Sequence, residues 1–154
     1  MRILHYFARE LFYRGRWAET IPLFDRHARS DAWVDERAES LLYLGAAYRA
    51  LLPIDDVSAR PYVQAAVLAP WRRECWIRLA EWHMDHENWN GCLDAAHQTL
   101  AITERSSYFN QPWAWGARPY DLIALASHYL GRQADAIRYG EQACELAPDA
   151  ARLR

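Results

Sequence analysis

The chain has 154 residues, 52% of them hydrophobic and 25% charged, which is the composition of one compact globular domain rather than of a disordered segment. No apolar run approaches the ~20 residues that cross a membrane, and Arg2, His5 and Arg9 interrupt any signal-peptide pattern, so we expect a cytoplasmic protein. The net charge of −2 argues against nucleic acid as a partner, and the sequence also argues against a membrane partner. All 18 basic residues are arginine, which excludes a Schiff-base lysine and a P-loop lysine.

In chain order, the sequence predicts four pairs of helices, because apolar residues recur at spacings of three and four instead of alternating. The first helix of each pair carries two large residues, a small residue and a variable residue at the same offsets. These four sets are Leu4, Phe7, Ala8 and Leu11; Leu41, Leu44, Gly45 and Tyr48; Trp76, Leu79, Ala80 and His83; Tyr120, Ile123, Ala124 and Ser127. The small residues are 37, 35 and 44 positions apart, and such a period is typical of stacked helix pairs. A small residue lets two helices approach closely.

The turns within the pairs are predicted from glycine and polar residues. Gly15 in the first pair and Gly131 in the last pair suit the left-handed backbone that ends a helix. The second pair has the segment Leu52–Asp56 at this place, which lacks glycine and indicates a small insertion. In the third pair, Asn88 and Trp89 mark the turn.

These spacings resemble the tetratricopeptide repeat (TPR). The last unit carries the most family positions, which are Tyr120, Ile123, Ala124, Gly131, Ala136, Ala143 and Pro148. The first unit has Thr20 and His27 where the family usually has small residues. The resemblance implies an all-α fold, an α-solenoid of about four TPR-like antiparallel helix pairs in a right-handed superhelix. The implied arrangement is a single domain over 1–154, with units at about 1–34, 38–70, 73–103 and 117–150.

A narrower resemblance rests on three phrases, HYFARELFY at 5–13, APWRRE at 69–74 and AWGARPYDL at 114–122. They are similar to the repeat segment that follows the catalytic domain in some bacterial and phage family-2 glycosyltransferases. Together the two resemblances imply a protein–protein interaction or scaffolding module that docks, positions or dimerises a glycosyltransferase. The alternative of another class is direct binding of a glycan or nucleotide sugar through Tyr108, Trp113 and Trp115, and a third alternative is a purely structural oligomerisation module.

No catalytic motif is found, so we expect no enzyme activity from this chain by itself and no cofactor. A glycosyltransferase catalytic domain usually carries an Asp-x-Asp metal motif, whereas Asp55 and Asp56 are adjacent and follow no strand. His83 and His86 are three apart, a spacing that also suits a shared metal ion. We favour the interpretation that they end a helix, where histidine interacts with the last carbonyls.

The spacing of 44 indicates an aromatic insertion at 104–118, because an ordinary repeat has about 34 residues. The insertion carries Tyr108, Phe109, Trp113 and Trp115. Two interpretations stand. The segment is a functional loop, which binds a partner or stacks on the rings of a glycan or nucleotide sugar, or it is a plug that covers the seam between the third and fourth units.

The first helices of the pairs are expected to line a concave face that binds an extended peptide or another partner segment. By the repeat offsets, the residues expected on this face are His5, Arg9, Phe12, Tyr13, Arg49, Glu81, Met84, Asp121 and His128. Arg9 and Arg49 suit an anionic group held by two parallel hydrogen bonds. Each is equally well interpreted as a solvated surface charge.

Overall fold

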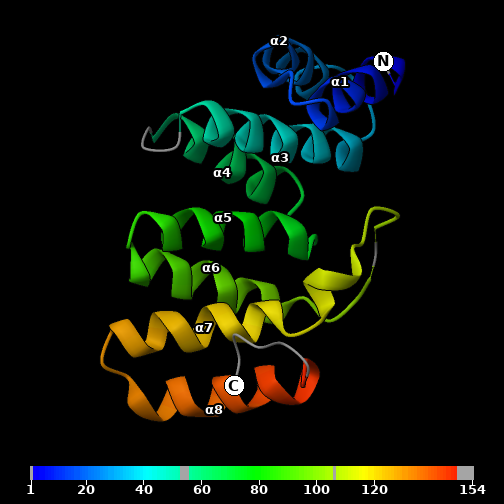
Figure 1. Cartoon of the computed structure of the whole chain (residues 1–154). Helices are drawn as coiled ribbons and strands as arrows, with labels where there is room; N and C mark the ends of the chain where they lie inside the picture. The colour runs from blue at the N-terminus through cyan, green and yellow to red at the C-terminus, as the bar shows by residue number, and fades with distance from the viewer. Residues whose placement is uncertain (1, 53–55, 106, 149–154) are drawn as a thin grey trace. The chain divides into compact units, whose positions relative to one another are not determined.

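The computed structural model describes residues 2–52, 56–105 and 107–148, and all regular structure in these ranges is helical (Figure 1). The α-helices are α1 (Arg2–Tyr13), α2 (Trp17–Ala28), α3 (Val34–Leu51), α4 (Ala59–Leu68), α5 (Arg73–Asp85), α6 (Trp89–Ala101), α7 (Arg118–Tyr129) and α8 (Gln133–Leu146). Two short 3₁₀ helices, η1 (Asp56–Ser58) and η2 (Pro112–Trp115), lie between them. The predicted all-α fold class is confirmed.

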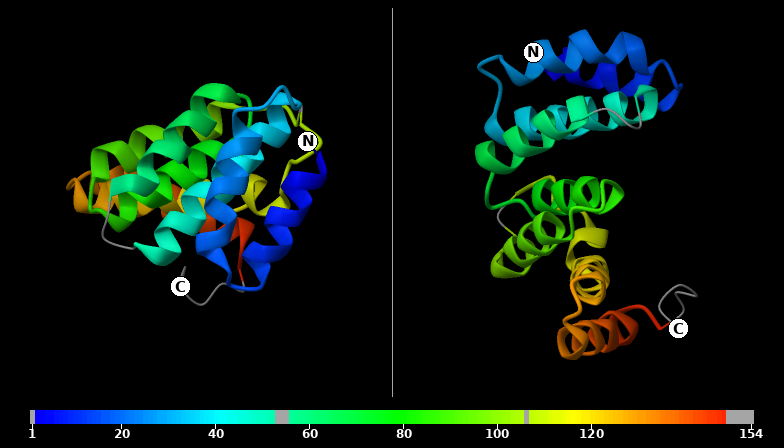
Figure 2. Two further views of the ribbon diagram at one scale, coloured as in Figure 1. Left: turned by 90° about the horizontal axis from the view of Figure 1, so that it is seen from above. Right: turned by 90° about the vertical axis from the view of Figure 1, so that its left-hand side faces the viewer.

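The helices form two compact units, residues 1–70 and 71–154. In unit 1, α1 packs on α2, α2 on α3 and α3 on α4; in unit 2, α5 packs on α6, α6 on α7 and α7 on α8 (Figure 2). Each unit therefore consists of two helix pairs. The second pair begins at Val34, so the expected start at residue 38 falls inside α3. No helix in the described ranges is long and apolar enough to cross a membrane.

The turns within three of the helix pairs use a left-handed residue. Gly15 between α1 and α2 and Gly131 between α7 and α8 both have φ 73°, as the sequence predicts. In the turn between α5 and α6 this conformation falls on Glu87, at φ 55°, where a side chain makes the backbone strained. The turn at 53–55, for which we predicted an insertion, lies outside the described residues.

The predicted small residues lie where helices approach closely. Ala8 and Ala80 are completely buried. A Cβ atom on Gly45 would lie 2.6 Å from the ring of Tyr62, so α3 and α4 meet there through a glycine and a tyrosine. Ala124 differs because it is only half-buried.

The two residues of the first pair that depart from the repeat pattern are both completely buried. The hydroxyl of Thr20 donates a hydrogen bond to the Trp17 carbonyl at 2.8 Å, and Nδ1 of His27 bonds to the Ser40 hydroxyl at 2.9 Å. These bonds pair the Thr20 hydroxyl and one ring nitrogen of His27, whereas Nε2 of His27 is buried without a hydrogen-bond partner among the described residues.

Candidate functional site

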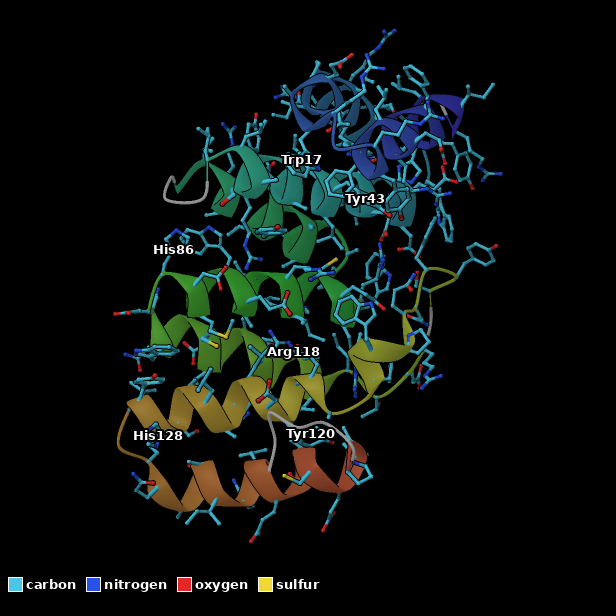
Figure 3. All side chains as sticks on the ribbon, viewed as in Figure 1. Trp17, Tyr43, His86, Arg118, Tyr120 and His128 are labelled. Carbon is cyan, nitrogen blue, oxygen red and sulfur yellow. The ribbon has the colours of Figure 1, made fainter. Side chains whose placement is uncertain are left out.

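The first candidate is a surface of unit 1 formed where α1 crosses α3, which we call the aromatic surface. Its members are Tyr6, Arg9, Phe12 and Tyr13 of α1 and Tyr43 of α3, of which Tyr43 is labelled in Figure 3. The phenol oxygens of Tyr13 and Tyr43 are hydrogen-bonded at 2.6 Å, and the Phe12 and Tyr43 rings meet edge to face at 5.1 Å. The guanidinium of Arg9 lies 4.8 Å from the centre of the Tyr6 ring.

The aromatic surface combines a fixed base with exposed rings. Tyr43 stacks almost parallel on the completely buried Phe24, with ring centres 5.2 Å apart, which holds its ring in place. Burial and the hydrogen bond with Tyr13 raise the pKa of Tyr43, so its phenol stays neutral. Above this base, Tyr6 is 42% exposed and Tyr13 is 65% exposed. Aromatic residues such as these tyrosines are enriched among the residues that anchor protein interfaces.

His5 is not part of this surface, which corrects the expectation drawn from its position in the repeat. Its side chain is buried, and the Ser40 hydroxyl joins Nδ1 of His5 at 2.7 Å to Nδ1 of His27 at 2.9 Å. A hydroxyl has one proton, so Ser40 donates to one imidazole and accepts from the other. Burial, with the charges of His27 and Arg9, lowers the pKa of His5 to about 4. His5 is therefore a neutral core residue of unit 1.

Arg49 was also expected on this face, but the structure does not place it with the aromatic residues. It is six residues beyond Tyr43 on α3, which is about 9 Å along the helix axis and about 120° around it. Of the residues expected on unit 1, the structure thus brings Arg9, Phe12 and Tyr13 together.

The second candidate is the face of unit 2 where α5 and α7 meet, and it is a network of ion pairs. Glu81 accepts hydrogen bonds from Arg118 at 2.9 Å and from Arg78 at 2.8 Å, and Arg118 also donates to Asp121 at 2.7 Å (Figure 3). Burial opposes the ionisation of Glu81, but the two arginines outweigh it and lower its pKa. We call Arg78, Glu81, Arg118 and Asp121 the charge network.

Two of the expected site residues, Glu81 and Asp121, belong to the charge network and make their contacts within unit 2. Glu81 is only 8% exposed, so it holds α5 to α7 and presents little surface to a partner. Met84 lies one turn further along α5 and is half-buried. His128 is exposed at the end of α7, where its ring meets that of Tyr129 edge to face at 5.4 Å.

The aromatic insertion is fixed to the start of α5. Nη1 of Arg73 donates to the Ala114 carbonyl at 3.5 Å, and the Gln111 amide donates to Glu74 at 2.6 Å. Nε and Nη2 of Arg73 donate to the Ile102 carbonyl, just before the insertion, at 2.9 and 2.6 Å. The guanidinium of Arg73 lies 3.9 Å from the centre of the Trp115 ring, and that of Arg105 lies 5.0 Å from it. Trp115 is half-buried between these contacts. These contacts favour the plug interpretation for Trp115.

The other aromatic residues of the insertion divide between packing and exposure. Trp113 lies beside the guanidinium of Arg78 at 4.7 Å, next to the charge network, and Phe109 lies 5.4 Å from that of Arg72. Tyr108 is 85% exposed at the tip of the segment. Ser106, within the insertion, lies outside the described residues.

Several residues that shape these surfaces were not among the site residues expected from the sequence, although Tyr6, Arg73, Glu74 and Arg118 lie in the three quoted phrases. They are Tyr6 and Tyr43 in unit 1 and Arg73, Glu74, Arg78 and Arg118 in unit 2. The pairs Arg78/Glu81 and Arg118/Asp121 are three apart on their helices, a spacing that indicates side-chain contact. No local spacing indicates Tyr43, because its neighbours come from α1 and α2.

His83 and His86 each contact neighbouring residues at the end of α5. The Nδ1 atom of His86 lies 2.8 Å from the Trp82 carbonyl, and the ring stacks on Trp82 at 4.1 Å. His83 bonds through Nδ1 to the Asn88 side chain at 3.1 Å. Within the described ranges, no group of three or more His, Cys, Asp or Glu residues is placed to hold a metal ion.

The helix pairs are similar to those of several solved structures. The MamA RS-1 ArsTM double mutant has a TM-score of 0.77 and 17% sequence identity, over 99% of this chain and 78% of that chain. The nearly identical TPR-like repeats of a putative kinesin light chain from Podosopora anserina have a TM-score of 0.68 and 18% identity, over 97% of this chain and 75% of that chain. The fold is TPR-like.

A crystal structure of MamA is also similar, with a TM-score of 0.74 and 18% identity over 95% of this chain and 77% of that chain. At these identities the likeness shows the TPR-like fold alone. No protein-family model and no curated protein matches the sequence. The glycosyltransferase resemblance is therefore carried by the three sequence phrases alone.

Proposed function

We propose that this chain is a cytoplasmic protein-interaction module and that the aromatic surface of unit 1 is its partner-binding site. The observation that carries the proposal is the pair of exposed tyrosines, Tyr6 and Tyr13, held on a base of packed rings beside Arg9. Tyrosine and arginine are enriched among the residues that dominate binding energy. Because the base is rigid, little side-chain entropy is lost when a partner binds.

The charge network supports the same assignment by contrast. Its four side chains satisfy one another within unit 2, so a partner that bound there would have to compete with contacts already made. In the aromatic surface, Arg9 faces a tyrosine ring, and a carboxylate on a partner segment would give it a charged acceptor. We therefore propose an extended or helical partner segment that offers apolar side chains and a carboxylate to α1 and α3.

The partner to test first is a family-2 glycosyltransferase catalytic domain, because of the three phrases in the sequence that resemble the repeat segment following that domain. In this proposal the module docks or positions the catalytic domain and contributes no catalytic residue.

The direct test places a photo-crosslinking amino acid at position 13 or at position 108 in the intact protein in cells. Both side chains are exposed, but only the first is in the aromatic surface. We expect a specific cross-linked partner from position 13 and none, or a much weaker one, from position 108. Cross-links from position 108 alone would move the site to the aromatic insertion. Cross-links from position 13 to the chain itself would favour the oligomerisation module.

A further inference from the structure

Unit 1 contains a groove that the aromatic surface does not use. Helices α2 and α4 both pack on α3, and between them lies a cleft of about 690 Å³. Leu41, Leu44 and Tyr48 of α3 line it, with Ala28 from α2 and Val67 from α4. Because each residue turns an α-helix by about 100°, these α3 residues lie on a different side of the helix from Tyr43. A ligand in this groove would leave the aromatic surface open.

Large apolar side chains are exposed to solvent along the groove. Val67 is 74% exposed and Val63, one turn before it on α4, is 45% exposed. Val57 of η1 is also exposed at this edge. Apolar side chains gathered beside a cleft mark binding surfaces, since leaving them in water is unfavourable.

The charged residues around the groove are mostly positive. They are Arg29, Arg37 and Arg60, against one acidic residue, Asp25. Nε of Arg29 pairs with Asp25 at 3.0 Å in an exposed ion pair, which leaves the guanidinium accessible. Nε of Arg37 donates to the Ala28 carbonyl at 2.9 Å, which fixes this side chain at the C-terminal end of α2.

Arg60 completes the positive charge on the opposite side of the groove. It is exposed on α4, and it makes no ion pair with any residue in the described part of the chain. Arginines from the end of α2 and from α3 and α4 thus lie around an apolar floor, and the groove carries a net positive charge among its described lining residues.

We propose that the groove binds an acidic amphipathic helix of a partner protein. The α3 floor positions follow the i, i+3, i+7 spacing of a helix face, so their ridge suits another helix packed along it. Apolar side chains of the incoming helix meet Leu41, Leu44 and Val67, and its carboxylates meet the arginines on either side. Arginine suits this role because its planar guanidinium binds a carboxylate through two parallel hydrogen bonds.

The test uses three synthetic fluorescein-labelled peptides with the full-length protein. The first is a stapled 12-residue helix with leucine on one face and glutamate on both flanks. The second replaces every glutamate by lysine, and the third replaces every leucine by alanine. We expect the glutamate peptide to bind at least tenfold more tightly than either control in fluorescence anisotropy. We also expect this difference to shrink as salt is raised.

Variants then locate the peptide in the groove. Val67→Asp and Arg60→Glu each should weaken the glutamate peptide at least tenfold; both side chains are exposed, so folding is retained and is checked by circular dichroism. Arg14→Glu makes the same charge change in unit 1 outside the groove and should weaken binding less than threefold. Tyr13→Ala should leave the affinity unchanged, which separates this site from the proposed partner surface.

Three results would overturn the proposal. One is equal binding of the glutamate and lysine peptides, and another is an affinity that neither Val67→Asp nor Arg60→Glu lowers. The third is a concentration-dependent dimer, measured by analytical ultracentrifugation, that Val67→Asp abolishes, because the occupant would then be a second copy of this chain.

Discussion

The same position of the repeat has different roles in the two units. Arg9 in α1 and Glu81 in α5 each follow the small residue of their helix by one position, and both were expected on a partner-binding face. Arg9 lies over an exposed tyrosine ring, whereas Glu81 is buried between Arg78 and Arg118. The difference arises because α7 places the cation Arg118 against Glu81, whereas the ring beside Arg9 belongs to Tyr6 of its own helix. The position in the repeat thus predicts which face of a helix carries a residue, but it does not predict whether that residue is free to contact a partner.

The largest difference that we expect between the units concerns two glycines within helices. Gly45→Leu should destabilise unit 1 by about 3 kcal/mol or more, because even a Cβ atom there would overlap the buried Tyr62 ring. Gly140→Ala in α8 should stabilise unit 2 by about 0.5–1 kcal/mol, because its nearest neighbour, the Ala124 Cβ, is 3.9 Å away. Urea unfolding followed by circular dichroism measures both. A loss of stability in both variants would mean that α7 leaves no room for a methyl group at position 140 of α8.

The charge network gives the next largest effect. Arg118→Ala should cost about 2–3 kcal/mol, because it leaves the nearly buried Glu81 with one arginine in place of two. Arg9→Ala in the aromatic surface should cost less than about 1 kcal/mol, because the contact that it removes is that of a guanidinium with the half-exposed Tyr6 ring. Thermal unfolding of the two variants gives the comparison. Equal losses of stability would contradict the view that the charge network holds unit 2 together while the aromatic surface is open to a partner.

The stability of unit 1 should also depend on pH more than that of unit 2. His5 has a pKa of about 4 in the folded chain, against an ordinary value near 6.5, so the unfolded chain binds a proton that the folded chain does not. The stability that the neutral His5 contributes is complete above pH 6.5 and is lost as the pH falls towards 4, by about 2–3 kcal/mol. Burial lowers the pKa of His27 as well, which acts in the same direction.

Amide hydrogen exchange of α1 and α3 at pH 7 and pH 4.5 measures this loss in unit 1 alone. His5→Gln removes the titrating group and should make the exchange less sensitive to pH. Protection that stays the same at both pH values in the unchanged protein would contradict the buried, neutral state of His5.

The smallest effect concerns the turns. Glu87→Gly should stabilise unit 2 by about 0.5–1 kcal/mol, because glycine adopts the left-handed backbone at this turn without strain, as Gly15 and Gly131 do in theirs. Differential scanning calorimetry should show a melting temperature raised by a few degrees. An unchanged or lower value would show that the Glu87 side chain stabilises the turn more than its backbone conformation costs.

The helix pairs were predictable from the sequence because their signals are local. The spacing of apolar residues, the small residue in each first helix and the glycines at 15 and 131 each act within one helix or one turn. The surfaces were less predictable because they depend on residues far apart in the chain. His5 is buried because Ser40 of α3 and His27 of α2 supply its polar neighbours.

The aromatic insertion shows the same limit. Its length and composition indicated its presence, and no local pattern shows that Arg73 and Glu74 fix it to α5. The sequence does not distinguish an aromatic residue that is covered by an arginine, such as Trp115, from one that is exposed to solvent, such as Tyr108.

The measurement that tests the central claim most directly compares Tyr13→Ala with Trp115→Ala in two readouts, the melting temperature and the affinity for the partner cross-linked at position 13. The account predicts that Tyr13→Ala lowers the affinity by about thirtyfold, which corresponds to ~2 kcal/mol, and leaves the melting temperature nearly unchanged. It predicts that Trp115→Ala lowers the melting temperature of unit 2 and leaves the affinity of the folded protein unchanged. The opposite result, with binding lost at Trp115 and stability lost at Tyr13, would contradict it.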